Sequence, residues 1–299
     1  MYRTVHERLL TLPDAVAVMP AHGAGGSSCG KNLSSELTST IGEQRRTNPS
    51  VQPMSEDAFV ALVADGQPAV PGYFSAAVAL NKSNRALLEQ DRFVSELSPG
   101  ELRVEMASGT RVLDARTPPD DFAAGHLRGS INVGFDGRFA ETGGMVADIG
   151  ERIVLITYPG EEQVAAMRLA RIGSDNALGY LTVDVDGIFP DALADLVRTA
   201  PRTTVSELEG LLASGAVTLI DIRNPGERDF GAIDGARSIP PLAQLRSQLA
   251  DLPRSKPIVV HCAGGWRSSV AASLLRADGI ENVSDLVGGY TAWVERSSE

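Results

Sequence analysis

The chain has 299 residues, of which 43% are hydrophobic and 22% charged, and its formal net charge is −11. This length predicts two domains or three small ones, and the apolar content excludes global disorder. The acidic balance argues against a nucleic-acid partner, whereas small anionic substrates respond to local charge and stay open. Two cysteines, Cys29 and Cys262, cannot build a disulfide framework, so we expect a reducing compartment.

Targeting signals and metal motifs are equally scarce in the sequence. Charges and Pro13 interrupt the N-terminal residues, which argues against a signal peptide, and no apolar run approaches the roughly 20 residues of a membrane helix. We therefore expect a cytoplasmic protein with no membrane partner. The histidines lie far apart in the sequence, which excludes every local two-histidine metal motif, and we expect no metal and no cofactor. They are His6, His22, His126 and His261.

The N-terminal stretch, residues 1–88, contains a helix–strand pair, a glycine-rich loop at 20–32 and helical patterning around Ser55–Ala64. This stretch is too short, and has too few strands, to form a substantial hydrophobic core of its own. Residues 86–100 have the pattern of a helix that runs into a linker, which we place at 89–99.

An internal repeat organises the rest of the chain. RVLDAR at 111–116 and TLIDIR at 218–223 are both apolar strands that end in Asp-x-Arg, and the segment 164–176 later matches 270–282 in the same order. These matches predict two homologous domains of about 100 residues. We call residues 100–198 the first repeat and residues 201–299 the second repeat.

Strands and helices alternate within the second repeat, which predicts an α/β fold with a parallel sheet covered on both faces. The site is then expected at the carboxyl ends of the strands, in the loop after the strand that ends at His261. The expected elements are a helix over Val205–Ala213, a strand over Val217–Ile222, a turn with Pro225 and Gly226, a short helix around Leu242–Leu249, a strand over Pro257–His261, a helix over Ser268–Asp278 and a strand over Asn282–Leu286.

Cys262 stands at the end of such a strand, in the segment IVVHCAGGWRSS at 258–269. Two glycines permit a tight loop, Arg267 adds a positive charge, and a helix N-terminus follows, which together make an anion cradle that favours a thiolate. Cys262 and Arg267 are the candidate catalytic residues. The candidate substrate-binding residues are Ala263, Gly264, Gly265, Trp266 and Ser268.

The segments HCAGGWRSSVAASLL and LVGGYTAW, together with LIDIR and the following Pro225-Gly226-Glu227, resemble a rhodanese domain over about 203–296. The resemblance implies a sulfurtransferase without a cofactor, in which Cys262 accepts sulfane sulfur from thiosulfate or a persulfide. The resulting Cys262 persulfide passes the sulfur to a thiol or cyanide. Small sulfur-containing anions and thiols are therefore the expected partners, and a homo-oligomer is left open.

The residues around the loop have less specific roles. For Asp221 and Arg223 we favour a supporting salt bridge over direct substrate contact. Trp266 either walls the pocket entrance or packs against apolar neighbours. His261 should point to the opposite side of its strand from Cys262, as a packed residue.

The first repeat resembles an inactive rhodanese domain. Cys262 aligns there with Ile156 or Thr157, and Arg267 with Glu161 or Glu162, so the nucleophile is absent and the charge is inverted. The family's usual histidine, which is Ala232 in the second repeat, is retained in the first as His126. We predict a structural role for it.

The N-terminal segments PAHGAG and IGEQRRTN resemble the C-terminal end of a metallo-β-lactamase-fold persulfide dioxygenase, over about 1–85. Such enzymes occur fused to rhodanese domains in this order. The family's H-x-H-x-D-H segment is missing, so His22 is at most a vestigial metal-site position, and Cys29 is predicted to be unreactive.

Three alternatives remain. A cysteine–arginine phosphatase needs five residues between cysteine and arginine, whereas Cys262 and Arg267 enclose four. A sulfur carrier without turnover would use the same Cys262 loop. A start site placed too late would make the true product a full metal-dependent dioxygenase fusion.

Overall fold

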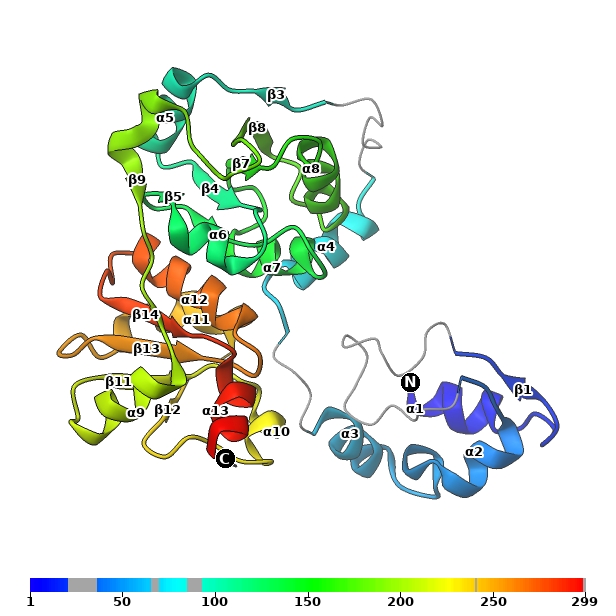
Figure 1. Ribbon diagram of the computed structural model, residues 1–299. Helices are drawn as coiled ribbons and strands as arrows, with labels where there is room; N and C mark the ends of the chain where they lie inside the picture. Colours follow the sequence, from blue (N-terminus) through cyan, green and yellow to red (C-terminus); the bar gives the residue numbers. More distant parts are fainter. Residues whose placement is uncertain (21–36, 66–69, 85–92, 240, 298–299) are drawn as a thin grey trace. The chain divides into compact units, whose positions relative to one another are not determined.

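The structure is a computed structural model that describes residues 1–20, 37–65, 70–84, 93–239 and 241–297. The chain divides into two compact units, Met1–Pro68 and Ala69–Glu299 (Figure 1). The second unit includes helix α4 (Tyr73–Lys82), which the sequence assigned to the N-terminal stretch. The reason is packing: a β-carbon added at Gly144 would lie 2.5 Å from the Tyr73 ring, so α4 rests on the first repeat.

The first unit is small. Its aromatic centre joins Tyr2, His6 and Phe59, with ring centroids 4.4 to 6.2 Å apart. Its elements are α1 (Tyr2–Thr4), a π-helical turn (Val5–Leu9), the antiparallel pair β1 (Ala17–Val18) and β2 (Ser39–Thr40), α2 (Ile41–Thr47), a 3₁₀ turn (Pro49–Val51) and α3 (Glu56–Ala64).

The first repeat forms a five-stranded parallel sheet in the order β3-β8-β7-β4-β6. A separate antiparallel pair, β5 with β9, lies outside this sheet. The elements are β3 (Ser95–Glu96), α5 (Pro99–Ala107), β4 (Arg111–Asp114), α6 (Pro119–Ala124), β5 (His126–Leu127), β6 (Ile131–Asn132), α7 (Phe139–Val146), β7 (Ile153–Thr157), α8 (Glu162–Arg171), β8 (Ala177–Thr182), a 3₁₀ helix (Asp191–Leu196) and β9 (Val197–Arg198).

The second repeat has the same arrangement, a parallel sheet in the order β10-β14-β13-β11-β12. The predicted α/β class with two similar parallel sheets is therefore confirmed. The elements are β10 (Arg202–Thr203), α9 (Val205–Ala213), β11 (Thr218–Asp221), α10 (Pro225–Arg228), β12 (Arg237–Ser238), α11 (Leu242–Leu245), a 3₁₀ helix (Arg246–Asp251), β13 (Ile258–His261), α12 (Trp266–Ala277), β14 (Val283–Leu286) and α13 (Gly289–Ser297).

Alternate side chains of the central strands face different helices. Val260 and Ile220 pack with α11 and α12, whereas Val259 and Leu219 pack with α9 and α13. The ribbons of α11 and α12 lie on one face of the sheet and those of α9 and α13 on the other (Figure 1). Both faces of the sheet are thus covered, which is why its central strands are apolar throughout. Across the described ranges, none of the helices combines the length and the apolar character needed to cross a membrane.

Three sequence predictions need correction. The expected turn at Pro225 and Gly226 is the short helix α10, because Asn224 and Glu227 form a capping box around its start. The helix expected around Leu242–Leu249 divides into α11 and a 3₁₀ helix. The predicted linker 89–99 contains the edge strand β3, which pairs with β8, and Ser98, which caps α5; residues 85–92 lie outside the described part.

Candidate functional site

Cys262 follows β13 at the carboxyl edge of the sheet and is 1% exposed. The loop after it turns into α12 at Gly265, whose φ of +92° lies in the left-handed region. A β-carbon added there would also stand 3.1 Å from the backbone nitrogen of Gly288. Glycine is therefore required at this point, both for the turn and for the close approach.

Helix α13 binds the carbonyl groups of the loop. The Tyr290 amide donates to the Cys262 carbonyl at 2.8 Å, and the Thr291 amide donates to the Ala263 carbonyl at 3.0 Å. Gly289 makes this possible, because a β-carbon added to it would lie 2.5 Å from the Cys262 carbonyl oxygen. With its carbonyl oxygens held on this side, the loop offers its amide N–H groups and the α12 N-terminus to an anion.

Ser268 lies beside the sulfur. Its hydroxyl is 3.5 Å from Cys262 Sγ and donates to the Gly265 carbonyl at 3.0 Å. The side chain is fully buried, so the hydroxyl bridges the nucleophile position and the glycine turn. Of the other predicted binding residues, Gly264 is exposed at the loop tip, and Trp266 is half-buried against the core.

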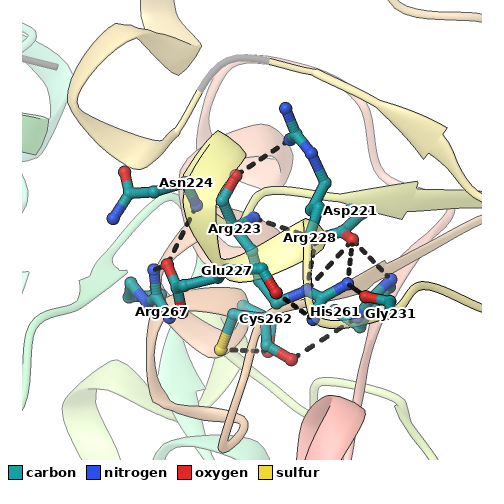
Figure 2. A network of polar contacts seen from close by, with 10 residues as sticks. Asp221, Arg223, Asn224, Glu227, Arg228, Gly231, His261, Cys262 and Arg267 are labelled. Carbon is teal, nitrogen blue, oxygen red and sulfur yellow. Dashed lines mark hydrogen bonds and ion pairs between the residues drawn. The ribbon is translucent and has the colours of Figure 1, made fainter. Parts of the chain in front are cut away.

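Arg267 is held by an acid that the sequence analysis did not single out. Its guanidinium makes two hydrogen bonds to the Glu227 carboxylate, at 2.8 and 2.6 Å (Figure 2). The pKa of Arg267 is raised, first by these bonds and further by Cys262. Burial raises the pKa of Glu227, but the bonds from Arg267 and the Asn224 amide outweigh it, so this pKa lies below its ordinary value. Arg267 thus remains charged at the site.

Asp221 and Arg223 form a buried ion pair with Nη2 and Oδ2 2.7 Å apart. The same guanidinium donates to the Gly231 carbonyl at 2.9 Å and lies 4.0 Å from the centroid of the Tyr290 ring. Burial raises the pKa of Asp221, yet the Arg223 hydrogen bonds bring it below its ordinary value. The pair therefore ties α10 and α13 to the sheet edge, which supports the loop.

His261 is completely buried in β13. Its Nε2 lies 3.6 Å from Asp221 Oδ2, and its Nδ1 lies 3.4 Å from the Cys262 carbonyl oxygen. Burial lowers the pKa of His261, so the ring is neutral at ordinary pH. These contacts are those of a packed residue.

The strand registers identify the counterpart of Cys262 in the first repeat. Asp114 pairs with Ile156 as Asp221 pairs with His261, so Thr157 occupies the position of Cys262. By the same count Glu162 replaces Arg267. Its carboxylate accepts a hydrogen bond at 2.7 Å from the amide of Gly160, which shares the φ of +92° of its counterpart.

Sequence reasoning missed two contributors to the site, Glu227 and the α13 N-terminus. The signal for Glu227 was present in the spacing Arg-x-x-x-Glu after the first strand, which places the acid one helical turn beyond Arg223. The signal for α13 was the pair Gly288-Gly289 before Tyr290. Both contributions depend on which loops meet at the edge of the sheet, and the tertiary structure determines this.

The N-terminal unit offers no comparable site in its described part. His22 and Cys29 lie outside the described residues. Within the described ranges, no three histidine, cysteine, aspartate or glutamate side chains gather where they could hold a metal ion.

A model of the rhodanese-like domain matches residues 98–186 and 204–296. Among curated proteins, the human thiosulfate:glutathione sulfurtransferase is 34% identical over an alignment of 113 residues, which covers 33% of this chain and 97% of that protein. The probable adenylyltransferase/sulfurtransferase MoeZ of Mycobacterium tuberculosis is 32% identical over 163 residues, 51% of this chain. This chain covers 40% of MoeZ, so it spans less than half of that relative.

A solved structure of a metallo-beta-lactamase from Staphylococcus aureus is also similar. It is 28% identical, with a TM-score of 0.50, and covers 60% of this chain and 49% of that one. The match is longer than residues 1–88, so it includes residues of the repeats. The similarity supports the predicted fusion of a metallo-β-lactamase-like segment with rhodanese domains.

Proposed function

The chain belongs to the rhodanese-like domain family, and from this premise we propose that it is a sulfurtransferase that works through a persulfide on Cys262. The observation that carries the proposal is the setting of this sulfur. It lies at the N-terminus of α12, under a loop whose carbonyl oxygens are bound by α13, and the Arg267 guanidinium is part of the same site.

The first half-reaction is a displacement at sulfur. The Cys262 thiolate attacks the sulfane sulfur of thiosulfate, a new S–S bond forms to Cys262, and the original S–S bond breaks with its electron pair leaving on sulfite. The anionic leaving group develops its charge where the loop amides, the helix N-terminus and Arg267 can stabilise it. A low-molecular-weight persulfide would react in the same way, with a thiolate as the leaving group.

The second half-reaction restores the thiolate. An acceptor thiolate or cyanide attacks the outer sulfur of the Cys262 persulfide, the S–S bond breaks, and its electron pair returns to Cys262. The acceptor leaves as a persulfide or as thiocyanate. No electron carrier is needed, so the reaction balances without a cofactor.

Two features separate this function from phosphate chemistry. The loop encloses four residues between Cys262 and Arg267, one fewer than the cysteine–arginine phosphatase pattern. Cys262 is also 1% exposed beneath this short loop. These features favour transfer of a single sulfur atom over attack on a phosphate monoester.

The test separates an enzyme from a sulfur carrier. The chain is incubated with thiosulfate and with either cyanide or glutathione, and thiocyanate or glutathione persulfide is counted per chain. Many equivalents of product per chain are expected. A yield that stops at one equivalent, with Cys262 left as a persulfide, would instead identify a carrier.

A further inference from the structure

The active-site loop of the second repeat touches the first repeat through Trp266. A β-carbon added to Gly134 would lie 2.5 Å from the Cη2 atom of the Trp266 indole and 2.8 Å from the methyl group of Thr117. The indole therefore lies flush against the backbone of the first repeat, in a place where any side chain larger than glycine would displace it.

A buried polar contact fixes the helix that follows. The backbone amide of Asn132 in β6 donates to Ser273 Oγ at 2.9 Å, and its side-chain oxygen accepts from Ser269 Oγ at 3.1 Å. All three residues are at most 5% exposed. Because Asn132 is itself held in the parallel sheet opposite Asp114, α12 is tied to a rigid element of the first repeat.

The far end of α12 is anchored as well. Arg111 Nη1, at the start of β4, lies 3.7 Å from an oxygen of Asp278, the C-cap residue that directly follows α12. Apolar residues of both repeats, among them Ile131 and Leu274, belong to one continuous core cluster. The helix whose N-terminus stabilises the sulfur is thus held along its whole length by the repeat that carries no nucleophile.

We propose that the first repeat acts as a positioning element of the Cys262 site, with Gly134 seating Trp266 and Asn132 holding α12. The inference rests on the proposed sulfur-transfer function and assigns a role to the silent repeat. Fixed donors stabilise a developing anion without a cost of reorganisation at the moment of reaction. Misplacement of such groups by about 1 Å can lower a rate by about 10²-fold.

The experiment compares Gly134→Ala with Gly137→Ala in the full-length chain. The two glycines have φ values of +52° and +57°, so alanine is strained to a similar degree at both, but only Gly134 faces Trp266, and Gly137 has open space. Both variants are made in a Cys29→Ser background, which leaves Cys262 as the only thiol. The readouts are kcat/KM for thiosulfate and the ratio of Cys262 alkylation rates with iodoacetate and iodoacetamide.

We expect Gly134→Ala to lower kcat/KM and the alkylation ratio by about tenfold, and Gly137→Ala to change each by less than about twofold. In a Trp266→Ala background, which should itself impair the site, Gly134→Ala should add less than about twofold, because the indole atoms are gone and only the Thr117 methyl group is left for the new β-carbon to displace. If Gly134→Ala fails to fold, the double variant Gly134→Ala/Trp266→Ala should fold.

Equal behaviour of the two glycine variants would overturn the proposal. So would an undiminished Gly134→Ala effect in the Trp266→Ala background, or a double variant that still fails to fold. The alkylation ratio distinguishes failure of the positioning proposal from failure of the sulfurtransferase proposal. If the parent chain has no turnover but the ratio follows Gly134, the sulfurtransferase proposal fails and the positioning role stands.

Discussion

The two repeats share a scaffold and differ in the residues to which we assign reactivity. Each has the same strand order, a buried Asp-x-Arg pair with its nearest nitrogen and oxygen 2.7 Å apart, and a loop glycine with a φ of +92°. The first repeat has Thr157 and Glu162 where the second has Cys262 and Arg267. The pair and the glycine therefore belong to the fold, and the proposed chemistry depends on the thiol and the charge that only the second repeat has.

The loops also use their amides differently. In the first repeat the Glu162 carboxylate accepts a hydrogen bond from the Gly160 amide, so the loop amide is already bound to an anionic group of the same loop. In the second repeat Arg267 is turned to Glu227, and the loop contains no acidic side chain. We therefore expect an external anion to meet a carboxylate in the first repeat and a guanidinium in the second.

The largest effect should come from removing the nucleophile. Cys262→Ser should lower thiosulfate–cyanide turnover by at least about 10³-fold, because serine is nearly isosteric but is not ionised near pH 7. The fold should be unchanged by circular dichroism. Cys29→Ser is the matched control and should retain turnover close to that of the wild type; persistent activity in Cys262→Ser would contradict the assignment of the site.

The shared ion pair should matter equally to both repeats. Removing one partner of a buried ion pair leaves the charge of the other partner buried and uncompensated. Asp114→Asn and Asp221→Asn should therefore each lower the free energy of unfolding by about 3–5 kcal/mol. Urea unfolding at pH 7 measures both. A loss confined to Asp221→Asn would mean that the pair serves the active loop rather than the fold.

These comparisons indicate where sequence reasoning succeeds. The strand before Cys262, the helix Val205–Ala213 and the duplication itself follow from local periodicity and self-similarity, and the structure agrees with them. The alignment of Cys262 with Thr157 needed the register of the sheet. The Glu227–Arg267 pair spans 40 residues of sequence and depends on two loops meeting at one edge, so the local spacing that marks Glu227 does not identify Arg267 as its partner.

Removing the positive charge should have the next largest effect. Arg267→Ala should lower kcat/KM for thiosulfate by about 10- to 100-fold, since a charge-assisted contact contributes about 1.5–3 kcal/mol. Arg267→Lys should recover only part, because an ammonium lacks the planar fork that Glu227 and an anion can share. Steady-state kinetics against thiosulfate measure this, and wild-type kinetics in Arg267→Ala would assign Arg267 a purely structural role.

His126, the family histidine that only the first repeat retains, should make the free energy of unfolding depend on pH. Burial lowers the pKa of His126 to about 4 from 6.5 in the unfolded chain, and its Nδ1 lies 3.1 Å from the Phe122 carbonyl oxygen. The unfolded state therefore binds the proton first as pH falls, and stability is lost below pH 6.5. Between pH 7 and 5 this loss should be about 2 kcal/mol.

His126→Asn should remove that part of the pH dependence. Urea unfolding at pH 7 and pH 5 measures the difference between the variant and the wild type. His6→Asn, in the N-terminal unit, is the control and should leave the difference in place. If the wild type and His126→Asn lose the same free energy, the proton is bound elsewhere.

The smallest expected effect concerns the silent loop. Thr157→Cys, made in a Cys29→Ser/Cys262→Ser background, places the only thiol of the chain in the first repeat. The Glu162 carboxylate, at the position of Arg267 by count, should repel iodoacetate relative to iodoacetamide. Both reagents must reach the same buried thiol, so burial slows both alkylation rates alike. The ratio of the two rates therefore reports the local charge.

Adding Glu162→Gln should raise that ratio, and adding Glu162→Arg should raise it further, to about tenfold above Thr157→Cys alone, equivalent to about 1.4 kcal/mol. Glu161→Gln is the matched control, since by count it occupies the position of Trp266 and not that of Arg267. A ratio that responds equally to both glutamates would mean that general acidity silences the first repeat. A response confined to Glu162 would mean that one charge at the Arg267 position sets which anions the loop admits.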